Sequence, residues 1–206
     1  MTSGNKKVKW LLGIVGGVLF SLGVLVGCLI PPKDNGIIPD TNKETLKIAD
    51  SSLSDVSLLF NYSGAVDLNT KAKEVTVYLD YYEQGDLKKH DSVIAFSQEE
   101  KSLKGRLVWG ISQDDELLTI ALASNSGSTI SNTTEVFWLK DEEGWMSGSS
   151  AADNKREIKV GSKYLLYKWV NDKSQSMSAY TDDSEEFNKE KIAKNDKLVQ
   201  LYIEFK

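Results

Sequence analysis

Cysteine and histidine are almost absent from this chain of 206 residues, which contains one of each, Cys28 and His90. A single cysteine cannot form an internal disulfide, so the fold must be held together by packing and hydrogen bonds. Zinc sites are built mainly from clustered cysteines and histidines, which this composition does not supply. The sequence also has no phosphate-binding glycine motif and no calcium-binding loop. We therefore expect no metal and no cofactor.

Proline is also scarce, and the three prolines of the chain all lie between residues 31 and 39. The segment 31–55 is polar and interrupted by turn-forming residues, which is typical of a linker. Within it, Thr45–Ala49 has the composition of a short regular element. The sequence predicts a linker over residues 31–55, followed by residues 56–206, which are numerous enough for one domain with a core of its own.

Charge is absent from one long run, the 21 apolar residues from Trp10 to Ile30. A helix of that length spans about 31 Å, close to the thickness of the hydrocarbon core of a bilayer. Lys6, Lys7 and Lys9 precede the run, and positive residues flank the cytoplasmic end of membrane helices. The sequence predicts a cytoplasmic tail (1–9), a single-pass membrane anchor, and a domain outside the cell membrane.

The residues Leu25-Val26-Gly27-Cys28 resemble the lipobox of bacterial lipoproteins. The resemblance implies cleavage before Cys28 and a lipid on its thiol, so that the run would be a lipoprotein signal. Two features depart from the usual pattern. The apolar stretch before Cys28 is longer than the core of a signal peptide, which has about 7–15 residues, and large apolar residues follow Cys28. The alternative is an uncleaved helix in which Cys28 packs as a small apolar side chain. Membrane lipid is a partner in both cases.

Five glycines fall within an arc of about 120° when the run is projected as a helix. They are Gly13, Gly16, Gly17, Gly23 and Gly27. Two pairs of them have the G-x-x-x-G spacing that lets membrane helices approach closely. If the run is retained, this face is a candidate contact with another membrane protein. The alternative is that glycine is simply common in membrane helices.

Acidic residues outnumber basic ones after the run, by 30 to 22, because three of the 25 basic residues precede it. The resulting net charge of −8 argues against nucleic acid as a partner and against direct binding to anionic lipid headgroups. An exported domain without disulfides fits a bacterial surface.

Alternating apolar and polar residues predict strands in the outer domain. The clearest case is Val75–Tyr82, followed by the turn Glu83-Gln84-Gly85-Asp86. We expect a hairpin of Ile158–Val160 and Lys163–Val170, closed by Gly161-Ser162. Further strands are predicted at Ser92–Phe96, Arg106–Ile111, Leu117–Ala123, Thr134–Leu139 and Leu198–Phe205.

One short surface helix is expected at Ser184–Lys194, with Asp183 as its N-cap and Glu186 completing a capping box. Roughly seven to nine strands and one late helix predict a mainly β domain. We expect an antiparallel β-sandwich, Ig-like, or a small barrel, preceded by a single N-terminal membrane helix.

Catalytic patterns are weak throughout the chain. His90 stands in the charged segment Lys88-Lys89-His90-Asp91, which predicts a solvated loop histidine, and no G-x-S-x-G motif is present. Carboxylates cluster at 114–116, 141–143 and 182–186. Such clusters are typical of solvated turns, although a glycosidase needs only two suitably spaced carboxylates. We expect no catalytic residues and no enzyme.

A candidate ligand contact is the pair Trp145 and Met146, which lies in a stretch rich in small residues. An aromatic side chain outside a strand pattern can stack on a sugar or anchor a partner; alternatively, Trp145 packs over the open end of the domain. The sequence therefore predicts an extracytoplasmic binding or scaffolding protein of the bacterial cell surface. The alternatives are a cell-wall glycan hydrolase using paired carboxylates and an accessory subunit of a membrane complex contacted through the glycine face.

Overall fold

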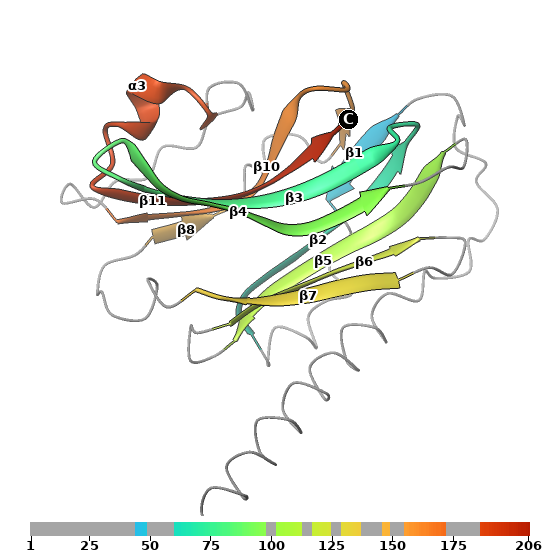
Figure 1. Ribbon diagram of the computed structural model, residues 1–206, viewed down its shortest axis with the longest axis horizontal. Helices are drawn as coiled ribbons and strands as arrows, with labels where there is room; N and C mark the ends of the chain where they lie inside the picture. The colour runs from blue at the N-terminus through green and yellow to red at the C-terminus, as the bar shows by residue number, and fades with distance from the viewer. Residues whose placement is uncertain are drawn as a thin grey trace, which may run out of the picture.

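The structure, a computed structural model, describes residues 44–48, 60–97, 102–112, 117–124, 129–136, 146–148, 155–171 and 186–206. This part of the chain is mainly β and forms two antiparallel sheets (Figure 1). The expected anchor with its five glycines, Cys28, and Trp145 lie outside the described residues. Among the described residues, no helix has the length and apolarity needed to cross a bilayer.

The first sheet has six strands in the order β7-β6-β5-β2-β1-β9. Their bounds are β1 Thr45–Ile48, β2 Phe60–Thr70, β5 Leu103–Ser112, β6 Leu117–Ser124, β7 Thr129–Glu135 and β9 Lys155–Glu157. The strand β1 falls in the range expected to be a linker, yet it pairs with both β2 and β9. The sheet thus begins before Val56, where the sequence placed the start of the domain.

The second sheet has five strands in the order β4-β3-β11-β10-β8. Their bounds are β3 Glu74–Glu83, β4 Asp86–Ser97, β8 Met146–Gly148, β10 Lys163–Asn171 and β11 Lys197–Phe205. The turn between β3 and β4 is as predicted: Gln84 and Gly85 both have positive φ, 51° and 85°, which matches the right-handed twist of the flanking strands.

The core lies between the two sheets. One continuous cluster of buried apolar side chains includes Leu107 and Ile120 of the first sheet and Leu201 and Ile203 of the second. The sheets approach each other along β4 and β7, where the Asn132 side chain donates to the Val93 carbonyl at 2.6 Å. The described strands form two separate sheets, so the barrel expected as an alternative is not formed among them.

The strand β11 is buried on both faces. Its inward side chains belong to the core, and three outward ones, Leu198, Gln200 and Tyr202, are also at most 3% exposed. The helix α3, Lys189–Ile192, lies against this outer face (Figure 1), where Ile192 packs with Leu198. The outer face of the second sheet is therefore partly covered rather than open to solvent.

Two sequence predictions are wrong in pairing or extent. The expected hairpin around Gly161 is absent, because β9 pairs with β1 in the first sheet and β10 pairs with β11 and β8 in the second. Gly161, with φ 83°, instead lies where the chain crosses between sheets. The helix is shorter than Ser184–Lys194: Asn188 is its N-cap and accepts from the Glu190 amide, and Asp183 lies outside the described residues.

Candidate functional site

A row of polar side chains crosses the outer face of the second sheet. Four strands place His90, Asp80, Gln200 and Lys168 directly opposite one another, in the strand order β4-β3-β11-β10. Alternation puts Asp80 on the face opposite to Leu79, which lies in the core. The row is therefore a product of register, since its members come from distant parts of the sequence.

Asp80 is the centre of this row. It is 2% exposed, and its carboxylate accepts hydrogen bonds from His90 Nδ1 at 2.6 Å and from the Tyr82 hydroxyl at 3.0 Å. An ionised carboxylate can only accept, so His90 donates through Nδ1. The other ring nitrogen, Nε2, is then free of the proton in the neutral ring, and the His90 side chain is 50% exposed. The site thus presents a fixed hydrogen-bond acceptor to solvent.

Two tyrosines are affected by Asp80. Burial, followed by the charge of Asp80 and a hydrogen bond to it, raises the pKa of Tyr82 well above its ordinary value. The same causes in the same order raise the pKa of Tyr202. Both hydroxyls therefore stay protonated and available as donors around the carboxylate.

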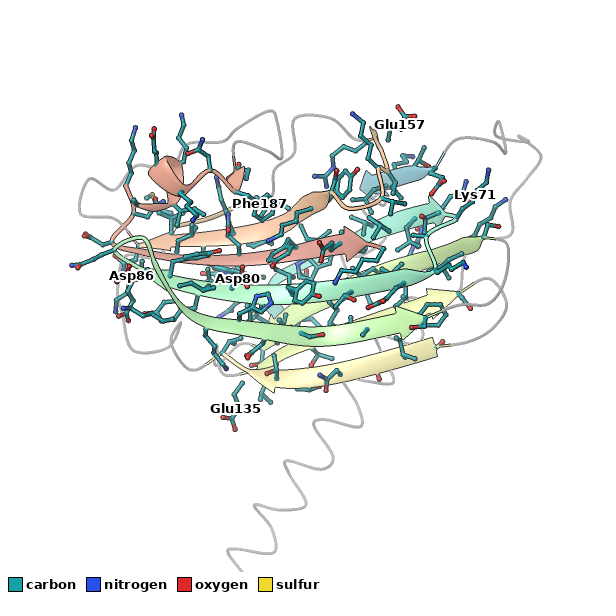
Figure 2. The ribbon with its side chains drawn as sticks, turned by 45° about the horizontal axis from the view of Figure 1, so that its top comes forward. Lys71, Asp80, Asp86, Glu135, Glu157 and Phe187 are labelled. Atoms are coloured by element: carbon teal, nitrogen blue, oxygen red, sulfur yellow. The ribbon has the colours of Figure 1, made fainter. Side chains whose placement is uncertain are left out.

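A row of four rings runs beside the carboxylate. His90 stacks on Tyr78 with centroids 4.9 Å apart and an interplanar angle of 16°, and Tyr78 stacks on Tyr202 at 5.4 Å and 25°. Phe187 continues the row, edge-on to Tyr202 at 5.1 Å. We call these four residues the ring row. Figure 2 shows Asp80 midway along the sheet and Phe187 on the same side of it.

Two exposed lysines lie over the ring row. Lys163 Nζ is 4.7 Å from the Tyr202 ring centroid and 5.5 Å from that of Phe187. Lys206 Nζ is 5.6 Å from the Tyr78 centroid, is hydrogen-bonded to the Tyr78 hydroxyl at 3.1 Å and lies 3.3 Å from Glu204. The hydrogen bond to Tyr78, then the one to Glu204, raises the pKa of Lys206. Both geometries match cation–π contacts.

A buried ion pair holds the end of the ring row. Lys168 Nζ lies 2.7 and 3.0 Å from the two carboxylate oxygens of Glu186, and both side chains are at most 6% exposed. The Gln200 amide donates to the Glu186 carbonyl at 2.8 Å, and its own oxygen accepts no hydrogen bond among the described residues. Because Phe187 follows Glu186 directly, these contacts fix where its ring stands.

A second feature is a groove of about 540 Å³ at the end of the sheet near the β3–β4 turn. It is lined by Glu83, Gln84, Asp86, Lys88, Asn171, Asp196 and Lys197. Asp86 marks this end of the sheet in Figure 2. Three carboxylates thus line one groove, although the described part of the chain holds no set of three acidic, histidine or cysteine side chains placed to bind a metal.

The structure corrects the interpretation of His90. The sequence predicted a solvated loop residue, whereas His90 lies within β4 and is bonded to Asp80. Met146, a predicted ligand contact, opens β8 opposite Val170 and is partly exposed, and its predicted companion Trp145 lies outside the described residues. Asp80 and three members of the ring row, Tyr78, Tyr202 and Phe187, were not predicted as site residues from the sequence. The available signal was the polar face of β3, where Tyr78, Asp80 and Tyr82 alternate with core residues.

A family model described as the YgaN domain matches residues 40–205. No curated protein sequence and no solved structure matches the chain.

Proposed function

The chain belongs to the YgaN domain family, and we propose that it is a membrane-anchored, extracytoplasmic binding protein whose ligand site is the ring row. The observation that supports this is a polar and aromatic face whose side chains are held in position by contacts with buried polar residues. Asp80 orients His90, and the Lys168–Glu186 pair positions Phe187. Side chains held in this way lose little freedom when a ligand arrives, which favours binding.

A glycan of the bacterial cell wall is the ligand class that fits this face best. Sugars bind through stacking on aromatic rings and through hydrogen bonds from precisely oriented polar groups. Phe187 is partly exposed, Tyr78 is partly exposed at the edge of a ring stacked between His90 and Tyr202, and His90 is exposed, so aromatic surface and a fixed acceptor are both accessible. In this proposal the domain is an Ig-like sandwich that the anchor holds at the outer surface of the membrane.

The test is retention on purified, insoluble bacterial cell wall. The full chain, held in nanodiscs of a neutral lipid, is sedimented with the wall material. We expect Tyr78→Ala and His90→Ala to weaken retention about tenfold, since each removes a contact worth about 1–2 kcal/mol. Lys104→Ala, an exposed change in β5 of the other sheet, is the control. Equal retention of all three variants would exclude the ring row as the site.

The mode of anchoring is a separate part of the proposal. We expect the membrane-extracted protein to be either full length, with the glycine face available to another membrane protein, or lipidated at Cys28. Intact-mass measurement separates a full-length chain from one that begins at Cys28 with a lipid attached. A mass showing cleavage before Cys28 would remove the proposed role as an accessory subunit contacted through the glycines, because the helix would be gone.

A glycan hydrolase is the second candidate function, and the groove near the β3–β4 turn supports it. Glu83 and Asp196 approach this groove from different parts of the chain, and hydrolysis of a glycosidic bond requires two such carboxylates. If this activity exists, Glu83→Gln or Asp196→Asn should abolish the release of reducing ends from wall glycan. Lys88→Gln, which changes another residue lining the same groove but no carboxylate, is the matched control. No release by the unaltered chain would exclude the activity.

A further inference from the structure

The charges that a ligand meets first at the ring row are positive. Lys163 and Lys206 are exposed there, whereas the carboxylates beside them are less accessible to solvent. The Asp80 side chain is 3% exposed and that of Glu204 is 19% exposed. This arrangement is unusual for a domain whose net charge after the anchor is −8.

The two lysines are held in position rather than free in solvent. Lys163 lies over two rings and 3.4 Å from the Tyr202 hydroxyl. Lys206 is fixed by the Tyr78 hydroxyl and Glu204. Both therefore keep their ammonium groups next to aromatic surface, which is the combination that receives a ligand bearing sugar rings and negative charge.

We propose that the ring row binds an anionic glycan, whose phosphate or carboxylate groups contact Lys163 and Lys206 while its sugar rings lie against Phe187 and the exposed edge of Tyr78. This inference rests on the proposed binding function and specifies its ligand. A neutral glycan would form no ion pair with either exposed ammonium group, and Lys163 would gain no counter-charge from it. An anionic lipid surface is disfavoured, because the remainder of the acidic domain would be repelled by it.

The experiment uses defined polymers and the full chain in phosphatidylcholine nanodiscs. The probes are phosphomannan, the matched unphosphorylated mannan, and polygalacturonate as the carboxylate counterpart. We expect phosphomannan to bind more tightly than mannan, and its affinity to fall as salt is raised, because exposed charges are screened. Comparing phosphomannan with polygalacturonate shows which anionic group is preferred.

Three variants make the test specific. Lys163→Gln with Lys206→Gln should weaken phosphomannan binding about tenfold, which is the expected effect of losing charge-assisted hydrogen bonds. Glu204→Gln should strengthen binding, because it removes the carboxylate beside Lys206. Lys104→Gln should change it less than about twofold. Thermal midpoints of all three variants are compared with that of the unaltered chain, and both substituted lysines are exposed, so loss of folding is not expected.

Several outcomes would overturn the inference. One is equal affinity for mannan and phosphomannan, and if that binding still depends on Tyr78 and His90, the proposed binding function stands while the charge preference fails. Another is the absence of binding to either anionic polymer. A third is lysine-dependent binding to phosphatidylglycerol vesicles with none to the polymers, which would make the ligand a lipid surface.

Discussion

His90 Nδ1 lies 2.6 Å from Asp80 Oδ1, across the β3–β4 pairing. The distance is short for a hydrogen bond between nitrogen and oxygen, as expected when the acceptor is an ionised carboxylate. One consequence concerns the neutral ring: its proton must reside on Nδ1. His90 is the single histidine of the chain, so ring nitrogen signals can be assigned without ambiguity.

We therefore expect nitrogen-15 spectra above neutral pH to show the Nδ1–H tautomer of His90. Asp80→Asn should shift the ring toward the Nε2–H form, which is the more stable form of a free imidazole, because the amide can also donate. The measurement is a long-range correlation spectrum of the imidazole nitrogens. Identical tautomers in the two proteins would show that Asp80 does not set the proton position. Asp67→Asn, in β2 of the other sheet, is the control.

A second prediction concerns alkaline pH. Because the pKa values of Tyr82 and Tyr202 are raised above the ordinary tyrosine value of about 10, the unfolded chain loses these protons at a lower pH than the folded chain. Stability from these two groups is therefore fully present below pH 10 and should decline as pH rises above it.

Absorbance at 295 nm measures this directly. Tyr82 and Tyr202 should ionise only above the ordinary tyrosine range, and the double variant Tyr82→Phe/Tyr202→Phe should lack these late steps. Asp80→Asn should bring both pKa values down, since the charge of Asp80 contributes to raising them. A titration curve that the double variant leaves unchanged would contradict the prediction.

The buried pair Lys168–Glu186 leads to a third prediction. Lys168→Met should lower the free energy of unfolding by about 3–5 kcal/mol, because it leaves the Glu186 carboxylate buried without this counter-ion. The double variant Lys168→Met/Glu186→Leu should recover most of the loss, since no buried charge remains. Denaturant unfolding followed by tryptophan fluorescence gives both values. A double variant as unstable as the single one would show that the pair itself, rather than its charge balance, is required.

In the described part of the chain, Gly85 and Gly161 both have positive φ and allow a matched comparison. Gly85→Ala would place a Cβ 2.9 Å from both the Cα and the Cβ of Ala193, whereas a Cβ at Gly161 would meet nothing within 4 Å. Both changes carry the cost of a left-handed backbone, about 1–2 kcal/mol. We expect Gly85→Ala to cost at least about 1 kcal/mol more, because it also separates α3 from the β3–β4 turn. Equal unfolding free energies would show that this contact contributes nothing.

The strands that could be predicted are those whose two faces differ in polarity. In β3, Val75, Val77 and Leu79 lie in the core while alternate residues face outward, so period two is visible in the sequence. By contrast, β2 contains Ser63 and Gly64 and shows no clear alternation. Its Gly64 is needed because the Trp109 ring occupies the place of a Cβ, which would stand 2.2 Å from that ring. The sequence alone does not show this requirement, because it depends on the pairing of β2 with β5.

The candidate site around Asp80 and His90 could not be predicted from the sequence for a related reason. The charged residues before His90 resemble a turn, yet they continue β4 at the edge of the sheet, where polar side chains meet solvent and protect the edge. Asp80 and His90 become neighbours only through the register of the hairpin. Lys163 and Phe187 come from segments that are brought to Tyr202 by tertiary packing, and no local pattern records this.

The double burial of β11 has a consequence for how the domain assembles. β11 pairs with β3 on one side and with β10 on the other. Phe205 at the end of the domain must therefore pair with Val75, which lies near its start in the sequence. Contacts of such long range slow folding, because the loop must close before the contact is made. Before β11 has paired, no described strand connects the β3–β4 hairpin to β10 within the second sheet. A chain truncated before Lys197 would therefore be left with a sheet in two pieces rather than a shorter sheet, and would expose two unpaired edges to aggregation.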